Sequence, residues 1–189
     1  MTLSSLLVPT FSQMLRSLSG WLDKAEAQKG PAEAEALLGA RLAADMYPLA
    51  TQVRFACVQV HEAGHRLRGL EFPPIVAELL AEGRDSGENP GTLADAQARI
   101  AQALSFIEGL APGALDADPQ SPIAHALPIG MTLDLTAEQY ARDWVLGQFY
   151  FHVMTAYAIL RSQGLEIGKA DYVPHMLAYL RPADAPAAG

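Results

Sequence analysis

The chain has 189 residues, of which half are hydrophobic and 18% are charged. This composition is typical of a globular protein and excludes a disordered chain. The formal net charge of -8 repels phosphate backbones, so no nucleic-acid partner is expected. No apolar run approaches the roughly 20 residues of a membrane span, and the N-terminus lacks the pattern of a signal peptide. We therefore expect a cytoplasmic protein with no membrane partner.

The first predicted helix begins after Thr2 or Ser4, either of which can cap it, and runs to about Gln28. Pro9 lies inside this range, so the helix begins there or is kinked. A Lys-Gly-Pro sequence at 29–31 ends it. Hydrophobic residues at spacings of three and four form one apolar stripe, which consists of Leu7, Phe11, Met14, Leu15, Leu18 and Leu22.

A short helical piece at 32–38 precedes a second long helix, which is predicted from Tyr47 to Leu70. Pro48 suits the first turn of this helix, and a Pro-Pro pair at 73–74 follows its end. The next segment, 81–91, is rich in glycine and charged residues and is predicted to be a solvated loop. The stripe of the second helix consists of Leu49, Val53, Ala56, Val60, Gly64 and Leu67.

Thr92 is predicted to cap a third long helix over 93–110, whose apolar residues again recur at helical spacing. The following segment, 111–135, is irregular. Two short apolar stretches in it, 123–127 and 131–135, are separated by Pro-Ile-Gly and can form a small β-hairpin.

Thr136 begins a fourth long helix that continues to about Gln163, with Gly164 at its end. Four long helices with apolar stripes can bury those stripes only against one another. The predicted fold class is therefore all-α, a four-helix bundle with long irregular connections and a small β-hairpin before the last helix. We expect a single helical-bundle domain over 1–180 and a flexible tail over 181–189.

The single cysteine, Cys57, excludes an internal disulfide and a cysteine-based zinc cluster. Its place between Ala56 and Val58 in a helical pattern predicts a small buried hydrophobic residue. A nucleophile is the alternative, which would require an electropositive and accessible setting.

Residues 61–65 read His-Glu-Ala-Gly-His, which satisfies the H-E-x-x-H motif of zinc peptidases. In that motif the two histidines, here His61 and His65, bind the metal, and the glutamate, here Glu62, is the general base. On a helical wheel, however, His61 lies about 110° and His65 about 150° from the centre of the apolar stripe, and Glu62 points almost directly outward. The pattern therefore favours a solvent-exposed helix face over a peptidase site.

His152 shares a mostly apolar face of the fourth helix with Gln148 and Thr155, so it is predicted to point inward. A buried histidine needs a hydrogen-bond partner, and Gln52 or Asp45 could provide one across the bundle. It is either a core residue with its hydrogen bonds satisfied or a metal or substrate ligand in the bundle core. One imidazole with carboxamides is a poor ligand set for Zn²⁺ or Ni²⁺.

Two histidines in less regular segments, His125 and His175, could reach the same pocket, which sequence spacing does not decide.

The stretches FYFHVMTAYAILRSQGLEIGKADY (149–172) and ARLAADMYPLATQVRFAC (40–57) resemble a bacterial family known only as a domain of unknown function. That family is grouped with the DinB/YfiT-like four-helix bundles, which are often described as candidate metalloenzymes. The resemblance covers nearly the whole chain and implies a homodimer. It also implies a metal site of one histidine on the second helix and an H-x-x-x-H pair on a later helix.

His152 falls on the second histidine of that pair, but Gln148 stands at the first, and the second helix offers Gln52 in place of histidine. The sequence thus departs from the metal-binding pattern at two of three places. Either the site has degenerated or it holds something other than the usual divalent ion.

Three hypotheses follow. The first is a DinB-like bundle with a cleft near His152, Gln148, Gln52 and Asp45, which is a metal- or thiol-cofactor-linked enzyme or a binding protein that has lost its divalent metal (Zn or Ni). The second is the zinc peptidase of residues 61–65. The third is a non-catalytic module that dimerises or binds a small molecule.

Overall fold

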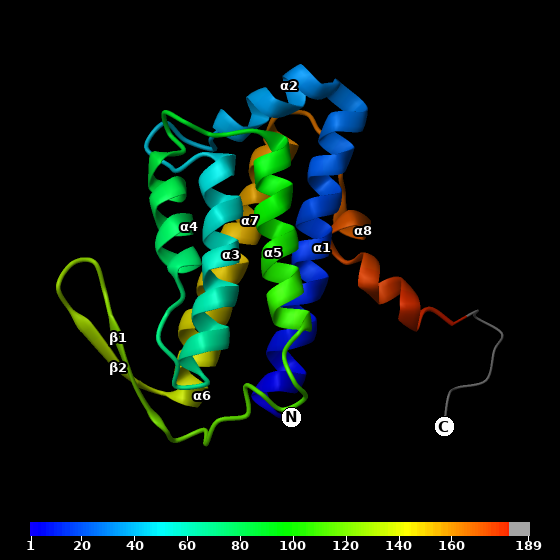
Figure 1. Cartoon of the computed structure of the whole chain (residues 1–189). Coiled ribbons are helices and arrows are strands. Elements are labelled where there is room, and N and C mark those ends of the chain that lie inside the picture. The colour runs from blue at the N-terminus through cyan, green and yellow to red at the C-terminus, as the bar shows by residue number, and fades with distance from the viewer. Residues whose placement is uncertain (182–189) are drawn as a thin grey trace.

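The computed structural model describes residues 1–181, which form a bundle of long helices (Figure 1). The four long helices predicted from the apolar stripes are confirmed as α1 (Leu3–Lys29), α3 (Leu49–Arg66), α5 (Leu93–Glu108) and α7 (Leu146–Ser162). Helix α3 is the central element, because it contacts α1, α5 and α7. The predicted tail lies outside the described residues except for its first residue, Arg181.

The first helix begins at Leu3, before Pro9, with a capping box between Thr2 and Ser5. All six residues of its predicted apolar stripe are buried. At its C-terminal end, Gly30 leads into α2 (Pro31–Ala36) and the short 3₁₀ turn η1 (Leu37–Gly39), where the sequence predicted a short helical piece.

Helix α4 (Pro74–Asp85) was missed, and the prediction of a solvated loop from residue 81 was wrong over its first part. Pro73 and Pro74 set the start of this helix, and Val76, Leu79 and Gly83 are buried. Because α4 packs against α3 from outside the bundle, α3 is covered on nearly every side (Figure 1). All its residues from Leu49 to Gly64 except Phe55 are therefore buried.

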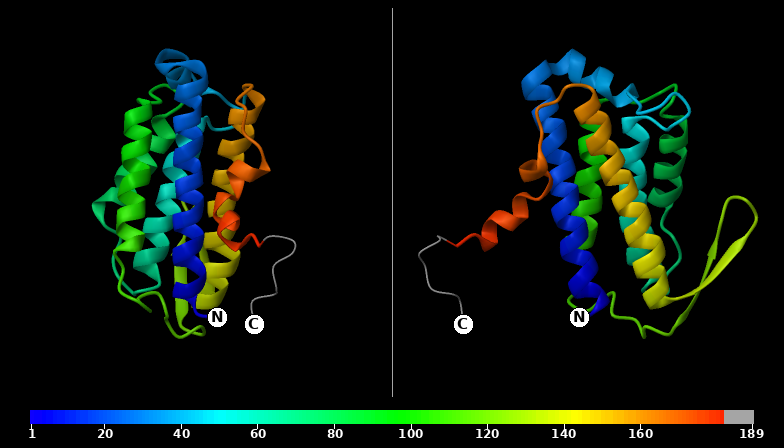
Figure 2. Two further views of the ribbon diagram at one scale, coloured as in Figure 1. Left: turned by 90° about the vertical axis from the view of Figure 1, so that its right-hand side faces the viewer. Right: turned by 180° about the vertical axis from the view of Figure 1, so that it is seen from behind.

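The predicted hairpin is present as β1 (Pro122–Ala126) and β2 (Thr132–Thr136), which pair antiparallel with Ile123 opposite Leu135. It lies beside α3 and α4, on the side of the bundle opposite the C-terminal pieces α8 (Lys169–Tyr172) and η3 (Pro174–Tyr179) (Figures 1 and 2).

The last long helix begins as predicted with Thr136, which forms a capping box with Gln139 in α6 (Ala137–Gln139). It then passes through a π-helical segment, η2 (Tyr140–Val145), before α7. π-Helical turns are rare and occur frequently at functional sites, because they re-aim the side chains that follow. Gly164 ends the helix with a φ of 78°, a conformation that favours glycine.

The core is aromatic where α1 meets α7, with the rings of Phe11 and Phe149 4.8 Å apart at a steep angle. Trp21 packs on Tyr157 and Tyr172 and donates a hydrogen bond to the Asp171 carbonyl oxygen at 2.9 Å. Among residues 1–181, no helix combines the length and the apolar character needed to cross a membrane.

Candidate ligand-binding cleft

A cleft of about 850 Å³ lies between α3, α4, the hairpin and the start of the last helix. This volume falls in the range of about 300–1,000 Å³ that is usual for small-molecule sites. Most of the wall is hydrophobic and aromatic, with a few polar groups. The lining includes Tyr47, Phe55, Gln59, Glu62, Phe72, Arg84, His125, Trp144, Gln148, Phe151 and His152.

Glu62 contributes a carboxyl group to this wall and is only 8% exposed. It makes no hydrogen bond or ion pair with any described residue. Burial raises its pKa from 4.5 to about 7, and the nearby Arg66 guanidinium only partly opposes this. The carboxyl is therefore poised to gain or lose a proton near neutral pH, as a general acid or base requires.

His152 is held in one tautomer by Gln52. The Gln52 Nε2 donates to the Tyr47 carbonyl oxygen at 3.2 Å, which turns the Gln52 Oε1 toward His152 Nδ1 at 2.9 Å. Because Oε1 can only accept, Nδ1 carries the proton and Nε2 is left as an acceptor. Burial lowers the pKa of His152 to about 4, so the ring is neutral at physiological pH.

His125, on β1, packs its ring 4.5 Å from Trp144 and 5.6 Å from Tyr140, both on the π-helical segment η2. Burial lowers the pKa of His125, and burial together with the Glu62 carboxylate raises that of Tyr140. Within residues 1–181, His125 Nδ1 and Trp144 Nε1 are buried without a hydrogen-bond partner. Most buried polar atoms in folded proteins have a hydrogen-bond partner.

The His-Glu-Ala-Gly-His motif is not exposed, so the solvent-facing prediction was wrong: His61 is 3% exposed and Glu62 8%. Helices α4 and α5 cover the side of α3 that the wheel assigned to water. The motif is also split between two sites. His61 and His65 stack on Phe106 in a separate groove, whereas Glu62 lines the main cleft.

Gly64 makes this stacking possible. A Cβ at this position would lie 2.4 Å from Phe106 Cε1, which is too close for a carbon–carbon contact. Only glycine therefore lets the Phe106 ring pack against α3 and stack on both His61 and His65. His65 Nδ1 is committed to the His61 carbonyl oxygen at 2.8 Å. The geometry of a peptidase, in which both histidines and the glutamate face one metal, is therefore not formed.

Residues 3–173 match the family described as a domain of unknown function, DUF1993. The chain belongs to this family. The DUF1993 protein is also similar to the crystal structure of a DinB family member protein from Shewanella denitrificans, with 33% identity and a TM-score of 0.71 over 97% of this chain and 96% of that chain. The predicted family and DinB-like fold are thus confirmed. Comparison with curated proteins gives no match.

The three-histidine metal site that the resemblance implies does not fit the side chains of the DUF1993 protein. Gln52 and Gln148 replace two of the histidines, and Gln52 binds His152 Nδ1. Within residues 1–181, no three His, Cys, Asp or Glu side chains lie close enough together to hold a metal ion. The amide of Gln52 thus serves as a hydrogen-bond partner that orients the imidazole.

The predicted site residues are partly brought together. Gln148 and His152 line the cleft, and Gln52 stands behind His152. Asp45 is exposed in the turn before α3 and does not line the cleft, so we remove it from the candidate site.

The sequence assigned Glu62 only to the alternative peptidase site, as its base, and did not single out Gln59 or Trp144 as residues of the cleft wall. The signal was present, because Phe55, Gln59 and Glu62 recur at spacings of four and three and so form a second stripe on α3.

Cys57 is fully buried, as predicted, and burial raises the pKa of its thiol to about 12. It therefore stays protonated, which removes the alternative of a nucleophilic thiolate.

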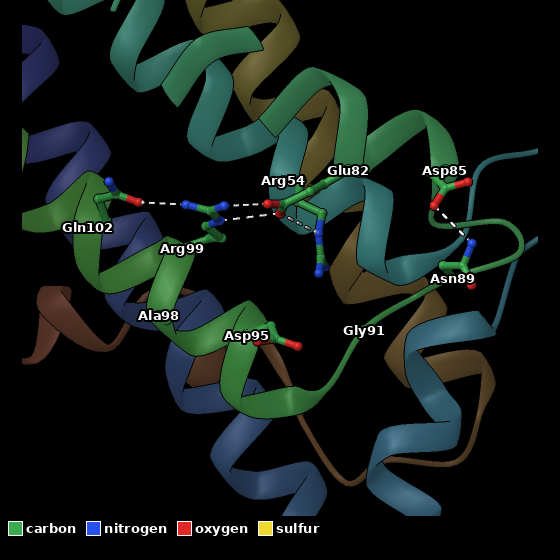
Figure 3. A pocket seen from close by; sticks show the side chains of 9 residues that line it. All are labelled: Arg54, Glu82, Asp85, Asn89, Gly91, Asp95, Ala98, Arg99 and Gln102. Atoms are coloured by element: carbon green, nitrogen blue, oxygen red, sulfur yellow. Dashed lines mark hydrogen bonds and ion pairs between the residues drawn. The ribbon is translucent and has the colours of Figure 1, made fainter. Parts of the chain in front are cut away.

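A smaller polar pocket of about 350 Å³, bordered by α3, α4 and α5, has a structural explanation (Figure 3). Glu82 on α4 pairs with Arg99 on α5 and accepts from Arg54 Nε at 3.3 Å. Arg54 is 3% exposed and also donates to the Ala50 carbonyl oxygen. These ion pairs connect three helices, so we assign this pocket to stability.

Proposed function

We propose that this DUF1993 protein binds a small, largely apolar organic molecule in the cleft and that Glu62 exchanges a proton with it. The observation that carries the proposal is the Glu62 carboxyl, which has no partner within residues 1–181 and is buried in the wall of an aromatic cleft of suitable volume. A buried ionisable group with a pKa near 7 in such a place is a candidate for acid–base chemistry. The acceptor atom His152 Nε2 then orients the molecule by taking one hydrogen bond from it.

The two tryptophans provide the test, because Trp144 lines the cleft while Trp21 is buried elsewhere and hydrogen-bonded to Asp171. In a ¹⁵N spectrum of the indole groups, benzyl alcohol is expected to shift the Trp144 signal and leave the Trp21 signal in place. Gln148→Phe, which fills the cleft, should abolish the shift. Gln163→Phe, at an exposed position after α7, should retain it. Equal shifts of both signals, or none, would count against the cleft.

A metal- or thiol-cofactor-linked reaction at His152, suggested by the resemblance, is the alternative. It is supported by His152 Nε2, whose lone pair makes no hydrogen bond within the described part of the bundle and could bind a metal ion. Such an ion would need its other ligands from outside the protein. Metal analysis of untagged protein tests it. Zinc or nickel in stoichiometric amount, lost in His152→Ala, would favour this alternative, and loss in His61→Ala would favour the peptidase hypothesis.

The homodimer that the resemblance implies is a separate proposal. It is supported by two large apolar residues that are exposed on α7 and do not line the cleft, Tyr150 (38%) and Met154 (43%). Analytical ultracentrifugation is expected to show a dimer that Met154→Asp weakens. A monomer at micromolar concentration would contradict the proposal.

A further inference from the structure

We propose that the molecule taken up by the cleft is a small organic cation, a protonated amine carried on an apolar body. This inference rests on the proposed function of the cleft and adds the chemical class of its ligand. It is carried by the position of the buried Glu62 carboxyl, the polar atoms of the cleft wall and the aromatic character of that wall.

The buried carboxyl of the cleft wall is not balanced by a buried positive charge among the lining residues. Apart from the histidines His125 and His152, the ionisable side chains of the lining that change or carry a charge near neutral pH are Glu62 and Arg84. Arg84 is exposed on α4, where water solvates it, whereas Glu62 is buried and forms no hydrogen bond or ion pair with any residue of the described part of the chain. The nearby Arg66 guanidinium lies over the Phe72 ring. A buried carboxylate without a partner is unfavourable, and a ligand that brings a positive charge removes this cost.

Two acceptor atoms that make no hydrogen bond across the described bundle belong to residues that line the cleft together with Glu62. His152 Nε2 accepts because Gln52 holds the proton on Nδ1, and Gln59 Oε1 is buried without a partner among the described residues. Trp144 Nε1 is a donor on the same wall, likewise without a partner among residues 1–181, and the side-chain amides of Gln59 and Gln148 can donate as well. An ammonium group donates three hydrogen bonds and suits this set, whereas a carboxylate or phosphate would face Glu62 and further acceptors.

The walls favour the same class of ligand. Five aromatic residues line the cleft, and a cation over an aromatic face is attracted by the ring. Arg66 already uses one of these rings in this way, with its guanidinium carbon 4.3 Å from the centre of the Phe72 ring. The other four are Tyr47, Phe55, Trp144 and Phe151.

The pH dependence of binding follows from the groups around Glu62. They are Arg66 on α3, Tyr140 on η2, Arg84 on α4, His125 on β1 and His152 on α7. Burial keeps Tyr140 and His152 neutral and favours the neutral form of His125, and a guanidinium group does not deprotonate in proteins. Glu62 is therefore the main titrating group between pH 5.5 and pH 8. A carboxyl with a pKa of about 7 is about 30 times more ionised at pH 8 than at pH 5.5. The affinity for an amine should therefore be up to about 30-fold higher at pH 8 than at pH 5.5.

The experiment compares benzylamine, benzyl alcohol and benzoate, three probes of the same size, by the shift of the Trp144 indole signal. We expect benzylamine to bind most tightly, benzoate most weakly, and only benzylamine to bind more tightly as the pH rises. Glu62→Gln should remove the preference for the amine but keep the binding of the alcohol. The control, Glu26→Gln, changes the net charge equally at an exposed position on α1 and should behave like the wild type.

The outcomes separate the two proposals. If benzyl alcohol binds and benzylamine binds no better at any pH, the cleft is a ligand site but the cationic class is refuted. If Glu62→Gln keeps the preference for the amine, the assignment of the recognition to Glu62 is refuted. If none of the three probes shifts Trp144, the proposed function falls as well. The pH dependence of benzylamine binding to the wild type tests the cationic class even if Glu62→Gln does not fold.

Discussion

Replacing Glu62 by glutamine should stabilise the protein, and by an amount that depends on pH. In the folded chain the pKa of Glu62 is raised to about 7, whereas an unfolded chain has the ordinary value near 4.5. Between these values the folded protein holds a proton that the unfolded chain releases. The free energy of unfolding therefore falls as the pH rises through this window.

The size of the effect follows from the same two values. A rise from 4.5 to about 7 corresponds to about 3 kcal/mol at about 1.4 kcal/mol per pKa unit. Glutamine cannot ionise, so Glu62→Gln should match the wild type near pH 4.5 and be more stable by about 3 kcal/mol at pH 8. With a urea dependence of about 3 kcal/mol/M, the midpoint at pH 8 would rise by about 1 M.

Urea denaturation of both proteins between pH 4.5 and pH 8.5 measures this difference. The buried histidines His61 and His152, whose pKa values are lowered to about 4, change stability in the opposite direction with pH. They are common to both proteins and cancel in the comparison. Glu26→Gln serves as the control and should follow the wild type. A difference between Glu62→Gln and the wild type that is the same at every pH would refute the reasoning.

Two further substitutions, at Gly64 and at Glu82, test how α3 is packed. Gly64→Ala should destabilise the protein by about 2 kcal/mol, because the new Cβ overlaps the aromatic ring packed on it. At Gly147 a new Cβ would meet nothing within 4 Å, so the control Gly147→Ala should be neutral or stabilising by up to about 1 kcal/mol. Thermal unfolding of both variants measures the difference, and equal effects of the two substitutions would contradict the packing of Phe106 on Gly64. Glu82→Gln should cost about 3 kcal/mol, since it leaves the buried Arg54 without its carboxylate. Exposed Glu78 pairs with Arg99 at 3.6 Å, so Glu78→Gln should cost much less in urea denaturation. Equal losses of stability in Glu82→Gln and Glu78→Gln would show that the buried Arg54 does not depend on the Glu82 carboxylate.

The fold could be predicted because its determinants are local. The apolar stripe of α1, the capping residues Thr92 and Thr136, and the glycine at 164 each act within a few residues of chain. The hairpin was also recoverable, from two short apolar stretches around a Pro-Ile-Gly turn. Each of these features needs no knowledge of the partner helix.

The site could be predicted only in part, because one missed helix changed the environment of another. The wheel of α3 assumed a single buried face, which holds for a helix at the edge of a bundle. Helix α4 covers the opposite face, so Glu62, assigned to water, became a buried carboxyl in a cleft. The inward direction of His152 was correct, since its neighbours at helical spacing are apolar.

The sequence alone therefore determined the helices, their ends and the family, since stripes, caps and glycines act through nearest neighbours along the chain. The tertiary structure decided which side of α3 meets water, which nitrogen of His152 carries its proton, and that Glu62 stands apart from His61 and His65. The physical reason is that burial and hydrogen bonding across the bundle depend on residues far away in sequence. The same reason makes the pKa of Glu62 a property of the folded chain.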